Sequence, residues 1–467
     1  MYSSLKRLCI SICASLCFIA LPSDAQYTIL HNFNGIMGAE FNRYADFPSG
    51  SLTLSGNMLY GMTRYGGAYN YGCIFSIDTN GNEYKDFHDF DSITGKNPYG
   101  SLTYASGILY GMTEAGGASN FGCIFRIDTN GNAYRDMLDF NDTNGANPYG
   151  SLTLSGNKLY GMTWQGGHTL GCIFSIDTNG SEFKDIYKFN RSSGYNPYGS
   201  LIISGGQLFG MTWEGGMFGN VFSIDTNGNE YKNLHDFGGI GDGAGPYGSL
   251  VISGSVLYGM TTGDGNAGPG QFGNIFSIDT DGNAYKDLLN FGGATGGADP
   301  YGSLTLSEGI LYGMTLSNIF SIDTNGNVYK DLFKFTNYTT GSSPFGDLTL
   351  SGNMLYGIAD NGGTDSVGVI FSLNYVTAGI DNLIPAQGAI NVYPNPNNGR
   401  FTLSLSNINA VCNIEIYNLL GEKVYTGILQ QTKTNTINLI GQPSGVYFYR
   451  VLKESGAIVG SGKVVIQ

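Results

Sequence analysis

The sequence predicts an all-β fold: a seven-bladed β-propeller closed by its N-terminal strand, followed by a small C-terminal β-sandwich. Three observations predict it. A cassette recurs seven times, each copy contains four strand-like runs separated by turn residues, and the pattern changes after Tyr375. The predicted organisation is a signal peptide at 1–25, the propeller at 26–375, a linker at 376–390 and the sandwich at 391–467.

The first 25 residues have the layout of a secretory signal peptide. Lys6 and Arg7 give a positive start, an apolar run extends over 8–21, and the small residues Ser23 and Ala25 precede the expected cleavage after Ala25. The apolar run is shorter than the roughly 20 residues of a membrane-spanning helix. We therefore expect this segment to direct export, and we expect no transmembrane segment in the mature chain.

The repeat is marked by one aromatic residue in an L-Y-G-M-T element. Successive copies of this residue lie at Tyr60, Tyr110, Tyr160, Phe209, Tyr258, Tyr312 and Tyr356. A spacing of about 50 residues is typical of stacked supersecondary units, each too small to bury its own apolar face.

Each cassette contains four predicted strands. In the second copy they are Ser101–Tyr104, Ile108–Thr113, Cys123–Asp128 and Ala133–Phe140. Between the last two, Asn130 and Gly131 predict a tight hairpin with positive φ angles. Four antiparallel strands per repeat indicate a propeller blade, because β-solenoid repeats are usually shorter.

The strand count predicts how the ring closes. The seventh cassette ends after the run Val369–Leu373 and lacks a fourth strand. Before the first cassette, Tyr27–Phe33 has the pattern of that missing strand, which is the pattern of Tyr231–Phe237 in a complete cassette. The N-terminal strand is therefore expected to complete the last blade, which leaves no sheet edge exposed.

The L-Y-G-M-T, Gly-Gly and I-F-S-I-D-T-N-G elements resemble the GloVer tandem repeat, a family of secreted bacterial proteins with varied surface anchors. The resemblance covers the seven cassettes between Phe47 and Phe371. It implies a secreted repeat protein and no particular reaction, because the family is defined by its repeat and its anchors.

Six short strand-like runs follow the linker. They are Phe401–Leu405, Cys412–Tyr417, Lys423–Leu429, Thr436–Leu439, Val446–Leu452 and Gly462–Ile466. Several short strands in so small a region suggest a β-sandwich.

The same tail resembles a type A C-terminal sorting domain of the Bacteroidota type nine secretion system. The matching motif residues are Tyr393, Pro394, Asn395, Pro396, Gly399, Gly421, Gly445, Tyr447 and Lys463. The resemblance implies that the type nine machinery carries the chain from the periplasm across the outer membrane, to the outer cell surface or the medium. The alternative is a carbohydrate-binding or immunoglobulin-like sandwich that stays attached.

Charge and motif spacing argue against several classes of partner and cofactor. The net charge is -14 and Lys and Arg do not cluster, which argues against nucleic acid or an anionic membrane as partner. Cys73, Cys123 and Cys172 occupy one position in three successive cassettes, where packed sheets about 10 Å apart separate them too far for a disulfide. The recurrent Asp-Thr-Asn-Gly, first at Asp78, lacks the ligand spacing of a calcium loop and is explained by a hairpin turn. We therefore expect no cofactor and no metal.

The connections that vary between cassettes form the candidate binding surface. In a propeller, the links between second and third strands and the links between blades share one face, and here these links are long and variable. Trp164 and Trp213, the two tryptophans of the chain, have equivalent positions in these links. The further candidates are Tyr65, Tyr69, His168, Phe218 and Phe272. The alternative is that each tryptophan packs against its own blade.

The predicted function is a secreted cell-surface binding module, without enzymatic activity, for a glycan or another surface protein. No Ser-His-Asp group, CxxC pair or phosphate-binding loop is readable in the sequence, so no catalytic residue is assigned. The alternative is a polysaccharide-processing enzyme, a hydrolase or lyase, that uses carboxylates of the variable loops near the propeller axis.

Overall fold

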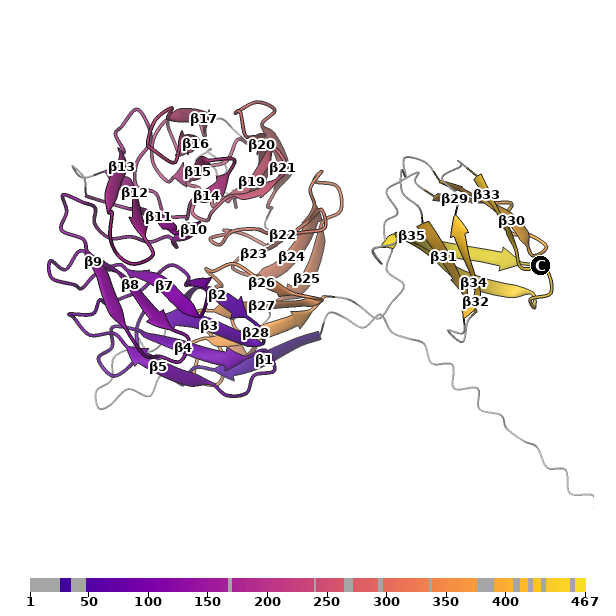
Figure 1. Ribbon diagram of the computed structural model, residues 1–467, viewed down its shortest axis with the longest axis horizontal. Helices are drawn as coiled ribbons and strands as arrows, with labels where there is room; N and C mark the ends of the chain where they lie inside the picture. Colours follow the sequence, from indigo (N-terminus) through magenta and orange to yellow (C-terminus); the bar gives the residue numbers. More distant parts are fainter. Residues whose placement is uncertain are drawn as a thin grey trace, which may run out of the picture. The chain divides into compact units, whose positions relative to one another are not determined.

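The computed structural model describes residues 26–34, 48–166, 170–238, 241–263, 272–292, 297–335, 338–375, 390–405, 412–418, 423–429, 434–453 and 458–467. The chain divides into two compact units, one spanning Asp24–Val376 and the other including Thr377–Gln467 (Figure 1). The predicted signal peptide at 1–25 and the predicted linker before Ile390 lie outside the described residues.

The first unit is all-β, as predicted. Its described residues form seven four-stranded antiparallel sheets, numbered here in chain order as sheets 1 to 7. Sheets 1 to 3 contain β2(Pro48–Ser55), β3(Met58–Thr63), β4(Cys73–Asp78) and β5(Lys85–Asp89); β6(Thr103–Ala105), β7(Ile108–Thr113), β8(Cys123–Asp128) and β9(Arg135–Asp139); and β10(Thr153–Ser155), β11(Lys158–Thr163), β12(Cys172–Asp177) and β13(Lys184–Lys188).

Sheets 4 to 6 repeat this plan, and the last sheet includes the N-terminal strand. They contain β14(Ile202–Ser204), β15(Gln207–Thr212), β16(Asn220–Asp225) and β17(Lys232–Asp236); β18(Val251–Ser253), β19(Val256–Thr261), β20(Asn274–Asp279) and β21(Lys286–Asn290); and β22(Thr305–Ser307), β23(Ile310–Met314), β24(Asn318–Asp323) and β25(Lys330–Lys334). Sheet 7 contains β26(Thr349–Ser351), β27(Met354–Ala359), β28(Val369–Asn374) and β1(Gln26–Asn32), and η1(Tyr338–Thr340) is a short 3-10 helix before it.

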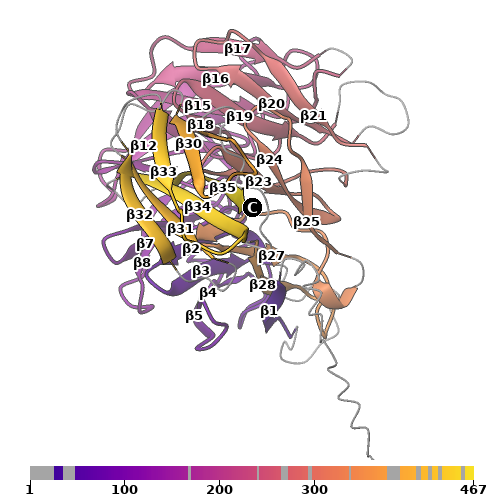
Figure 2. The same cartoon turned by 90° about the vertical axis from the view of Figure 1, so that its right-hand side faces the viewer.

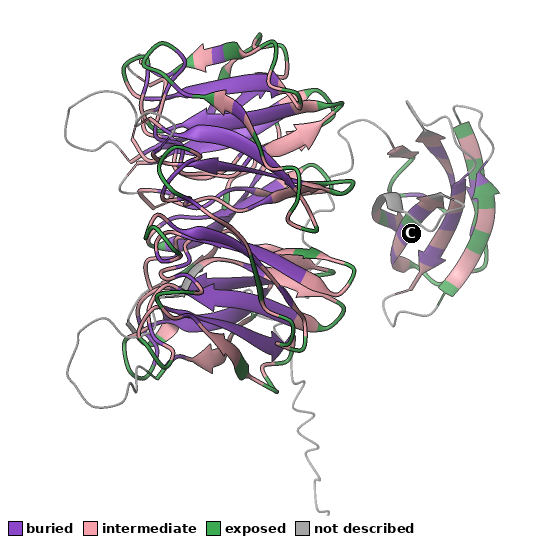
Figure 3. Cartoon of the chain, turned by 60° about the vertical axis from the view of Figure 1, so that its left-hand side comes forward, coloured by how far each residue is buried: buried purple, intermediate pink, exposed green. Residues whose placement is uncertain are grey.

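The two middle strands of each sheet are the most buried (Figure 3). Figure 1 shows the first strands near a common axis and the fourth strands at the outside. In sheet 1, Gly61 lies opposite Phe75, and a Cβ on Gly61 would lie 2.4 Å from Phe75 Cζ. The glycine of the L-Y-G-M-T element therefore makes room for the fully buried ring on the neighbouring strand.

Each apolar core is shared by two successive sheets. Tyr60, Met62 and Ile74 of sheet 1 pack in one cluster with Leu109 and Phe125 of sheet 2. The same arrangement recurs along the unit, and residues of sheet 7 share a cluster with residues of sheet 1. One sheet cannot bury its own apolar face, so the sheets depend on their neighbours for stability.

A cycle of hydrogen bonds joins equivalent residues that lie in or just before the first strand of each of the seven sheets. The backbone N–H of Ser51 donates to Ser101 Oγ at 2.7 Å, and the pattern continues through the equivalent residue of each sheet. The bonds join Ser51, Ser101, Ser151, Ser200, Ser249, Ser303 and Asp347 in this order. Asp347 N–H then donates to Ser51 Oγ at 2.6 Å, which returns the cycle to sheet 1.

The N-terminal strand β1 pairs with β28 in antiparallel register. Its side chains also contact both neighbouring sheets. Tyr27 stacks on Phe333 of sheet 6 with ring centroids 4.0 Å apart, and His31 stacks on Tyr84 beside sheet 1 at 3.7 Å. This strand therefore links sheets 6, 7 and 1 through aromatic contacts.

The Asp-Thr-Asn-Gly hairpins differ from the predicted turn. Gly81 has a φ of 88°, whereas Asn80 is not among the residues with positive φ, so the predicted pair of positive φ angles at Asn-Gly is wrong. The side chain of Asp78 determines the turn instead, because its Oδ1 accepts hydrogen bonds from Asn80 N at 2.9 Å and Asn82 N at 2.7 Å. The second positive φ of this connection lies at Glu83, at 58°, and an Asp side chain commonly accepts such bonds from nearby backbone N–H groups in turns.

The second unit has two sheets, of three and four strands (Figure 2). Its strands are β29(Ile390–Tyr393), β30(Arg400–Leu405), β31(Cys412–Tyr417), β32(Lys423–Leu429), β33(Thr434–Asn438), β34(Gly445–Lys453) and β35(Ile458–Ile466). All six predicted runs are present. The strand β29 was not predicted, because its first residue, Ile390, was assigned to the linker. Phe401, Leu403 and Ile437 of the smaller sheet pack in one core with Ile414 and Val451 of the larger sheet.

Candidate functional site

The residues near the central axis form the candidate site of the first unit. An aromatic residue precedes the first strand of sheets 2 to 7, and we call this set the axial aromatics. They are Tyr99, Tyr149, Tyr198, Tyr247, Tyr301 and Phe345. Successive rings contact one another, with centroids 4.4 to 5.2 Å apart. Tyr99 precedes sheet 2 and Tyr247 precedes sheet 5, yet their hydroxyl groups form a hydrogen bond of 2.8 Å.

A second set of equivalent residues lies next to the axial aromatics. Each member follows the L-Y-G-M-T element, and we call this place the rim position. Its residues are Arg64, Glu114, Trp164, Trp213, Thr262, Leu316 and Asp360. The same cassette position therefore carries a cation, two acids, two indoles, a threonine and a leucine, which is the variation expected of a recognition surface.

Three asparagine residues hold the backbone of the rim residues of sheets 1 to 4 in place. Asn97 Nδ2 donates to Arg64 O at 3.0 Å, and Asn97 O accepts a hydrogen bond from Glu114 N at 3.1 Å. Asn147 and Asn196 make the equivalent bonds in the next two connections. These asparagines have φ angles of 52° to 56°, a conformation that asparagine tolerates better than most residues. We call this arrangement the asparagine clamp.

The rim residues of sheets 1 and 2 are paired with each other. Arg64 Nη2 lies 2.7 Å from Glu114 Oε2, and the Tyr149 hydroxyl donates to Glu114 Oε1 at 3.0 Å. The Arg64 guanidinium also lies over Tyr99, 5.0 Å from the ring centroid. Burial raises the pKa of Asp360 well above its ordinary value, and the nearby charge of Arg64 opposes this shift. The charged groups on this side are thus occupied by internal partners.

The rim is open over sheets 4 to 6, where the clamp is missing. Gly245 and Asp299 replace the clamp asparagine, and Thr262 replaces the larger rim residues. A groove of about 360 Å³ lies here. It is lined by Trp213, Glu214, Met217, Phe218, Ala244, Gly245, Thr262, Gly263, Asp299 and Tyr301. The exposed fractions are 37% for Trp213 and 72% for Met217, so both present apolar surface to solvent.

The small size of Gly245 helps to create the groove. A Cβ at this position would lie 3.0 Å from Trp213 Nε1 and 3.2 Å from Thr262 Oγ1. Its φ of 59° matches the angle of the clamp asparagines, so the backbone is the same and the side chain is what differs. The groove therefore results from the loss of side-chain atoms on a conserved backbone plan.

The predicted site residues have different surroundings. Trp213 and Phe218 line the groove, whereas Trp164 is half-buried against Tyr149 and Tyr198, with centroids 5.6 and 6.0 Å away. The two tryptophans do not stack on each other among these contacts, because Tyr198 lies between them, 5.7 Å from Trp213. Trp164 Nε1 is buried with no hydrogen-bond partner among the described residues.

The other predicted residues lie apart from the groove lining. The Tyr65 ring is 5.4 Å from the Arg64 guanidinium, Tyr69 is 60% exposed, and Phe272 packs against the core shared by sheets 5 and 6. His168 lies outside the described residues. Sequence reasoning missed the axial aromatics, because Pro-Tyr-Gly recurs in almost every cassette and was assigned to folding.

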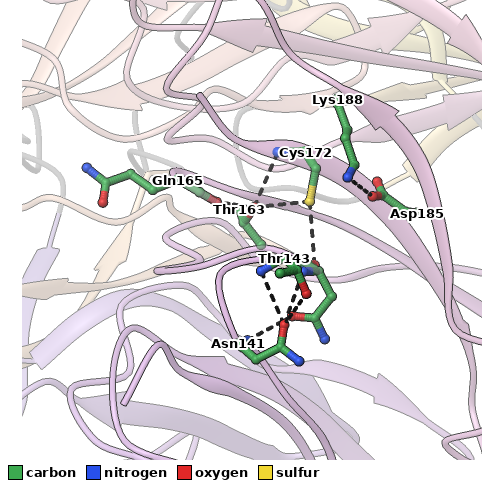
Figure 4. A network of polar contacts seen from close by, with 8 residues as sticks. Asn141, Thr143, Thr163, Gln165, Cys172, Asp185 and Lys188 are labelled. Carbon is green, nitrogen blue, oxygen red and sulfur yellow. Dashed lines mark hydrogen bonds and ion pairs between the residues drawn. The ribbon is translucent and has the colours of Figure 1, made fainter. Parts of the chain in front are cut away.

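The cysteines of the first unit belong to buried polar contacts. Figure 4 shows those of Cys172. Cys172 Sγ lies 3.2 Å from Thr163 Oγ1 and 3.7 Å from Asn144 O. Asn220 takes this place in sheet 4, where its Oδ1 accepts a hydrogen bond from Thr212 Oγ1 at 2.7 Å. Burial raises the pKa of Cys123 and of Cys172 to about 12, so these thiols stay protonated and unreactive at neutral pH.

In the second unit, the Tyr-Pro-Asn-Pro motif holds the end of the last strand. Asn395 Oδ1 accepts a hydrogen bond from Val465 N at 2.8 Å, and Asn395 Nδ2 donates to Lys463 O at 3.0 Å. Asn397 N donates to Val465 O at 2.9 Å, and Gln467 N donates to Asn397 O at 2.8 Å. Two motifs that are separate in the sequence are thus one structural element.

The remaining tail motif residues have structural roles. Tyr447 is buried and its hydroxyl donates to Pro443 O at 2.7 Å. Gly399 N donates to Asn397 Oδ1 at 2.8 Å, and Gly399 has a φ of 89°. Tyr393, Pro394 and Pro396 are exposed, Gly445 begins β34, and Gly421 lies outside the described residues.

The repeated cassettes match a family model, the Gloeobacter/Verrucomicrobia repeat, over residues 14–220 and 169–371. The chain belongs to this repeat family. The expected resemblance is therefore confirmed, and it accounts for all the sheets of the first unit. The family description names no reaction and no ligand.

The tail matches the secretion system C-terminal sorting domain over residues 391–467. The predicted type nine sorting domain is confirmed, and the chain is exported to the cell surface or secreted by that route. No helix among the described residues is long and apolar enough to cross a membrane. The second unit, in which the Tyr-Pro-Asn-Pro motif holds the terminal strand, is therefore the sorting domain.

Solved structures with a similar fold are distant in sequence. The extracellular domain of a hybrid two component system from B. thetaiotaomicron matches with a TM-score of 0.51 and 13% identity, over 96% of this chain and 59% of that chain. PorZ, a surface component of the type-IX secretion system of Porphyromonas gingivalis, matches with a TM-score of 0.39 and 12% identity, over 88% and 64%. Oligogalacturonate lyase matches with a TM-score of 0.47 and 11% identity, over 75% and 94%.

This chain spans less than two thirds of the length of the first two of these proteins. At such low identity the likeness concerns the fold alone. No curated protein matches the chain in sequence.

Proposed function

We propose that the first unit is a closed seven-bladed β-propeller and that β1 closes it. The cycle of hydrogen bonds that returns from Asp347 to Ser51 supports this proposal. The core shared by sheets 7 and 1 supports it as well, as does the pairing of β1 with β28. In this account the rim position surrounds the end of the propeller axis, and the groove lies at one side of that end.

We propose that the chain is an exported surface protein that binds a partner molecule in the groove beside Trp213, without enzymatic activity. The observation that carries this proposal is the exposure of Trp213 and Met217 in a groove formed where the asparagine clamp is missing. Exposed aromatic surface next to small residues lets a ligand ring or side chain stack on the indole. Export to the cell surface gives such a groove access to molecules outside the cell.

The ligand is a glycan or a surface protein. An aromatic ring flanked by carboxylates is suited to the apolar face and the hydroxyl groups of a sugar, and Trp213 with Glu214 and Asp299 offers these groups. The same residues suit a protein anchor side chain, because Trp, Tyr and Met are enriched in the centres of protein interfaces.

A second candidate function is cleavage of a polysaccharide. One observation favours it: Glu214 and Asp299 line the same groove, and burial raises the pKa of Asp299. A pair of carboxyl groups, one of them with a raised pKa, is the arrangement that glycosidases use as acid and base. Glu114 is a weaker candidate for this role because Arg64 and Tyr149 already bind its carboxylate.

A glycan array and a reducing-sugar assay, both on the purified mature chain, test the proposal. Trp213→Ala is expected to weaken binding by roughly tenfold, because a stacked aromatic contributes about 1 kcal/mol or more. Trp164→Phe serves as the matched control for tryptophan replacement at the same cassette position. Turnover of any polysaccharide that Glu214→Gln abolishes would favour the enzyme, and binding that Trp213→Ala leaves unchanged would refute this site.

A further inference from the structure

The charges around the groove are all of one sign. The two charged lining residues, Glu214 and Asp299, are both acids, and the lining contains no Lys, Arg or His. Between Lys232 and Lys330 the sequence contains two basic residues, His235 and Lys286, and they lie on the outer strands β17 and β21. The links between sheets 4 and 5 and between sheets 5 and 6 therefore carry no Lys or Arg. The link between sheets 3 and 4 carries Arg191, whose charge acts on Tyr195.

The acids of the groove have no internal cation. Among the described residues, neither Glu214 nor Asp299 is in an ion pair. This differs from Glu114, the acid of the opposite side, which is paired with Arg64 at 2.7 Å. A hydrogen bond with Glu214 raises the pKa of Tyr195, so the carboxylate accepts one neutral donor, and Arg191, which acts on Tyr195 in the opposite direction, forms no ion pair with Glu214 among the described residues.

The apolar walls of the groove also suit a cation. Trp213 and Tyr301 line it together with the two acids, and the faces of such rings attract ammonium and guanidinium groups. The aliphatic stem of a lysine or arginine side chain packs well on the same rings. Met217, which is 72% exposed, adds a flexible thioether that adapts to a protein surface.

We propose that the groove binds the side chain of a lysine or arginine presented by a partner polypeptide. The cationic head lies between the carboxylates of Glu214 and Asp299, and its stem packs on Trp213 and Tyr301. This inference rests on the proposed function of the groove and specifies the class of its ligand. It excludes anionic ligands such as uronate or sulfated glycans, because the groove has acids and no base to receive them.

A titration with synthetic peptides tests the inference. The mature chain in a Trp164→Phe background leaves Trp213 as the fluorophore, since the chain has 2 tryptophans. We expect a peptide of alternating lysine and glycine to change this fluorescence and to bind at least about tenfold more tightly than its glutamine counterpart. The lysine peptide is expected to bind more weakly as salt is raised, because salt screens exposed charges.

Isosteric variants identify the carboxylates that take part. Glu214→Gln and Asp299→Asn are each expected to weaken binding of the lysine peptide by about threefold to fivefold, with unchanged thermal stability. Glu230→Gln is the matched control, because Glu230 is an exposed acid in the hairpin between β16 and β17, on the opposite face. This control is expected to bind the lysine peptide as the parent chain does.

Equal affinity for the lysine and glutamine peptides would overturn the inference, as would full binding in the double variant of Glu214→Gln and Asp299→Asn. Tighter binding of chitosan oligosaccharides than of the peptide would also overturn it, because the cation would then come from an amino sugar. If neutral glycans bind in a way that Trp213→Ala abolishes while the lysine peptide does not, this inference fails and the proposed function stands. If no probe responds to Trp213→Ala, both fail.

Discussion

The rim over sheets 1 to 3 and the rim over sheets 4 to 6 have the same backbone arrangement but carry different side chains. On the first side the clamp asparagines are present, and Arg64 and Glu114 pair at 2.7 Å beneath them. On the second side Gly245 stands in the place of a clamp asparagine with nearly the same φ, and a groove opens beside Trp213. At this position the fold depends on the backbone conformation and not on the side chain. A cassette without the asparagine side chain can therefore keep its fold and leave room for a groove.

The largest effect is expected from removal of the N-terminal strand. Deleting residues 26–33 takes away the strand that pairs with β28 and stacks on sheets 6 and 1. If the two sides belong to one closed ring, the melting temperature should fall by about 10 °C or more, or the transition should lose its cooperativity. Calorimetry on the truncated and full mature chains measures this.

The same deletion should affect hydrogen exchange differently around the first unit. Hydrogen exchange should increase first in sheets 1 and 7, next to the lost strand, and last in sheets 3 and 4. A truncated chain that melts at the parent temperature would show that the first unit is not closed by β1.

The next effect concerns the paired side of the rim. Glu114→Ala leaves the Arg64 guanidinium half-buried without its partner and removes the acceptor of the Tyr149 hydroxyl. We expect a loss of about 2 kcal/mol in the free energy of unfolding, because a buried charged group loses its hydrogen bond. Urea denaturation measures this loss.

Ligand binding at the groove should be unaffected by Glu114→Ala. The matched change on the other side, Glu214→Ala, is expected to reverse the pattern, with little loss of stability and weaker binding. Equal effects of both changes on stability would mean that the two sides are not different in kind.

The smallest effect concerns the outer strands, which also differ between sheets. Burial, together with the charge of Asp89, raises the pKa of Asp86 to about 6 in sheet 1. In sheet 6 burial acts to raise the pKa of Asp331, but hydrogen bonds, first from Lys334, lower it overall. An acid with a raised pKa binds more protons in the folded state, so its contribution to stability is lost as pH rises from about 4 to about 6.

Lowering the pH from 7 to 5 should therefore increase the contribution of Asp86 to stability, whereas His31 and His88, whose pKa values are lowered by burial, act in the opposite direction. Asp89→Asn should reduce this gain, because it removes the neighbouring charge that helps to raise the pKa of Asp86. The change stays below about 1 kcal/mol, since solvent screens these outer groups. Thermal melts across this pH range would contradict the account if the parent and Asp89→Asn chains gave the same dependence.

Most of the fold was predictable because it follows from repetition. The L-Y-G-M-T element, with Gly61 facing Phe75, recurs about every 50 residues, and each recurrence is another pair of buried strands. The turn at Asp78 was predicted as a hairpin, but its type was not. The Asp side chain, not the Asn-Gly pair, supplies the local hydrogen bonds.

The site was predictable only in part. Trp213 and Phe218 were predicted from their place in the variable links, and they line the groove. Trp164 has the same cassette position as Trp213, yet it is half-buried against the axial aromatics. The two tryptophans differ in the residue of the next link that lies beside them. Asn196 donates a hydrogen bond to Trp164 O, whereas Gly245 has the equivalent place beside Trp213. This difference becomes meaningful only when contacts between neighbouring sheets are known.

The most direct test of the account restores the missing clamp with Gly245→Asn. The φ of 59° is one that asparagine adopts at the equivalent positions, so the fold should be kept. The Cβ of the new side chain would lie 3.0 Å from Trp213 Nε1 and 3.2 Å from Thr262 Oγ1, so the side chain takes up space between these two lining residues of the groove. We expect the Gly245→Asn chain to keep its melting temperature and to bind the ligand of the groove at least about tenfold more weakly. A Gly245→Asn chain that keeps its melting temperature and binds as tightly as the parent would contradict it.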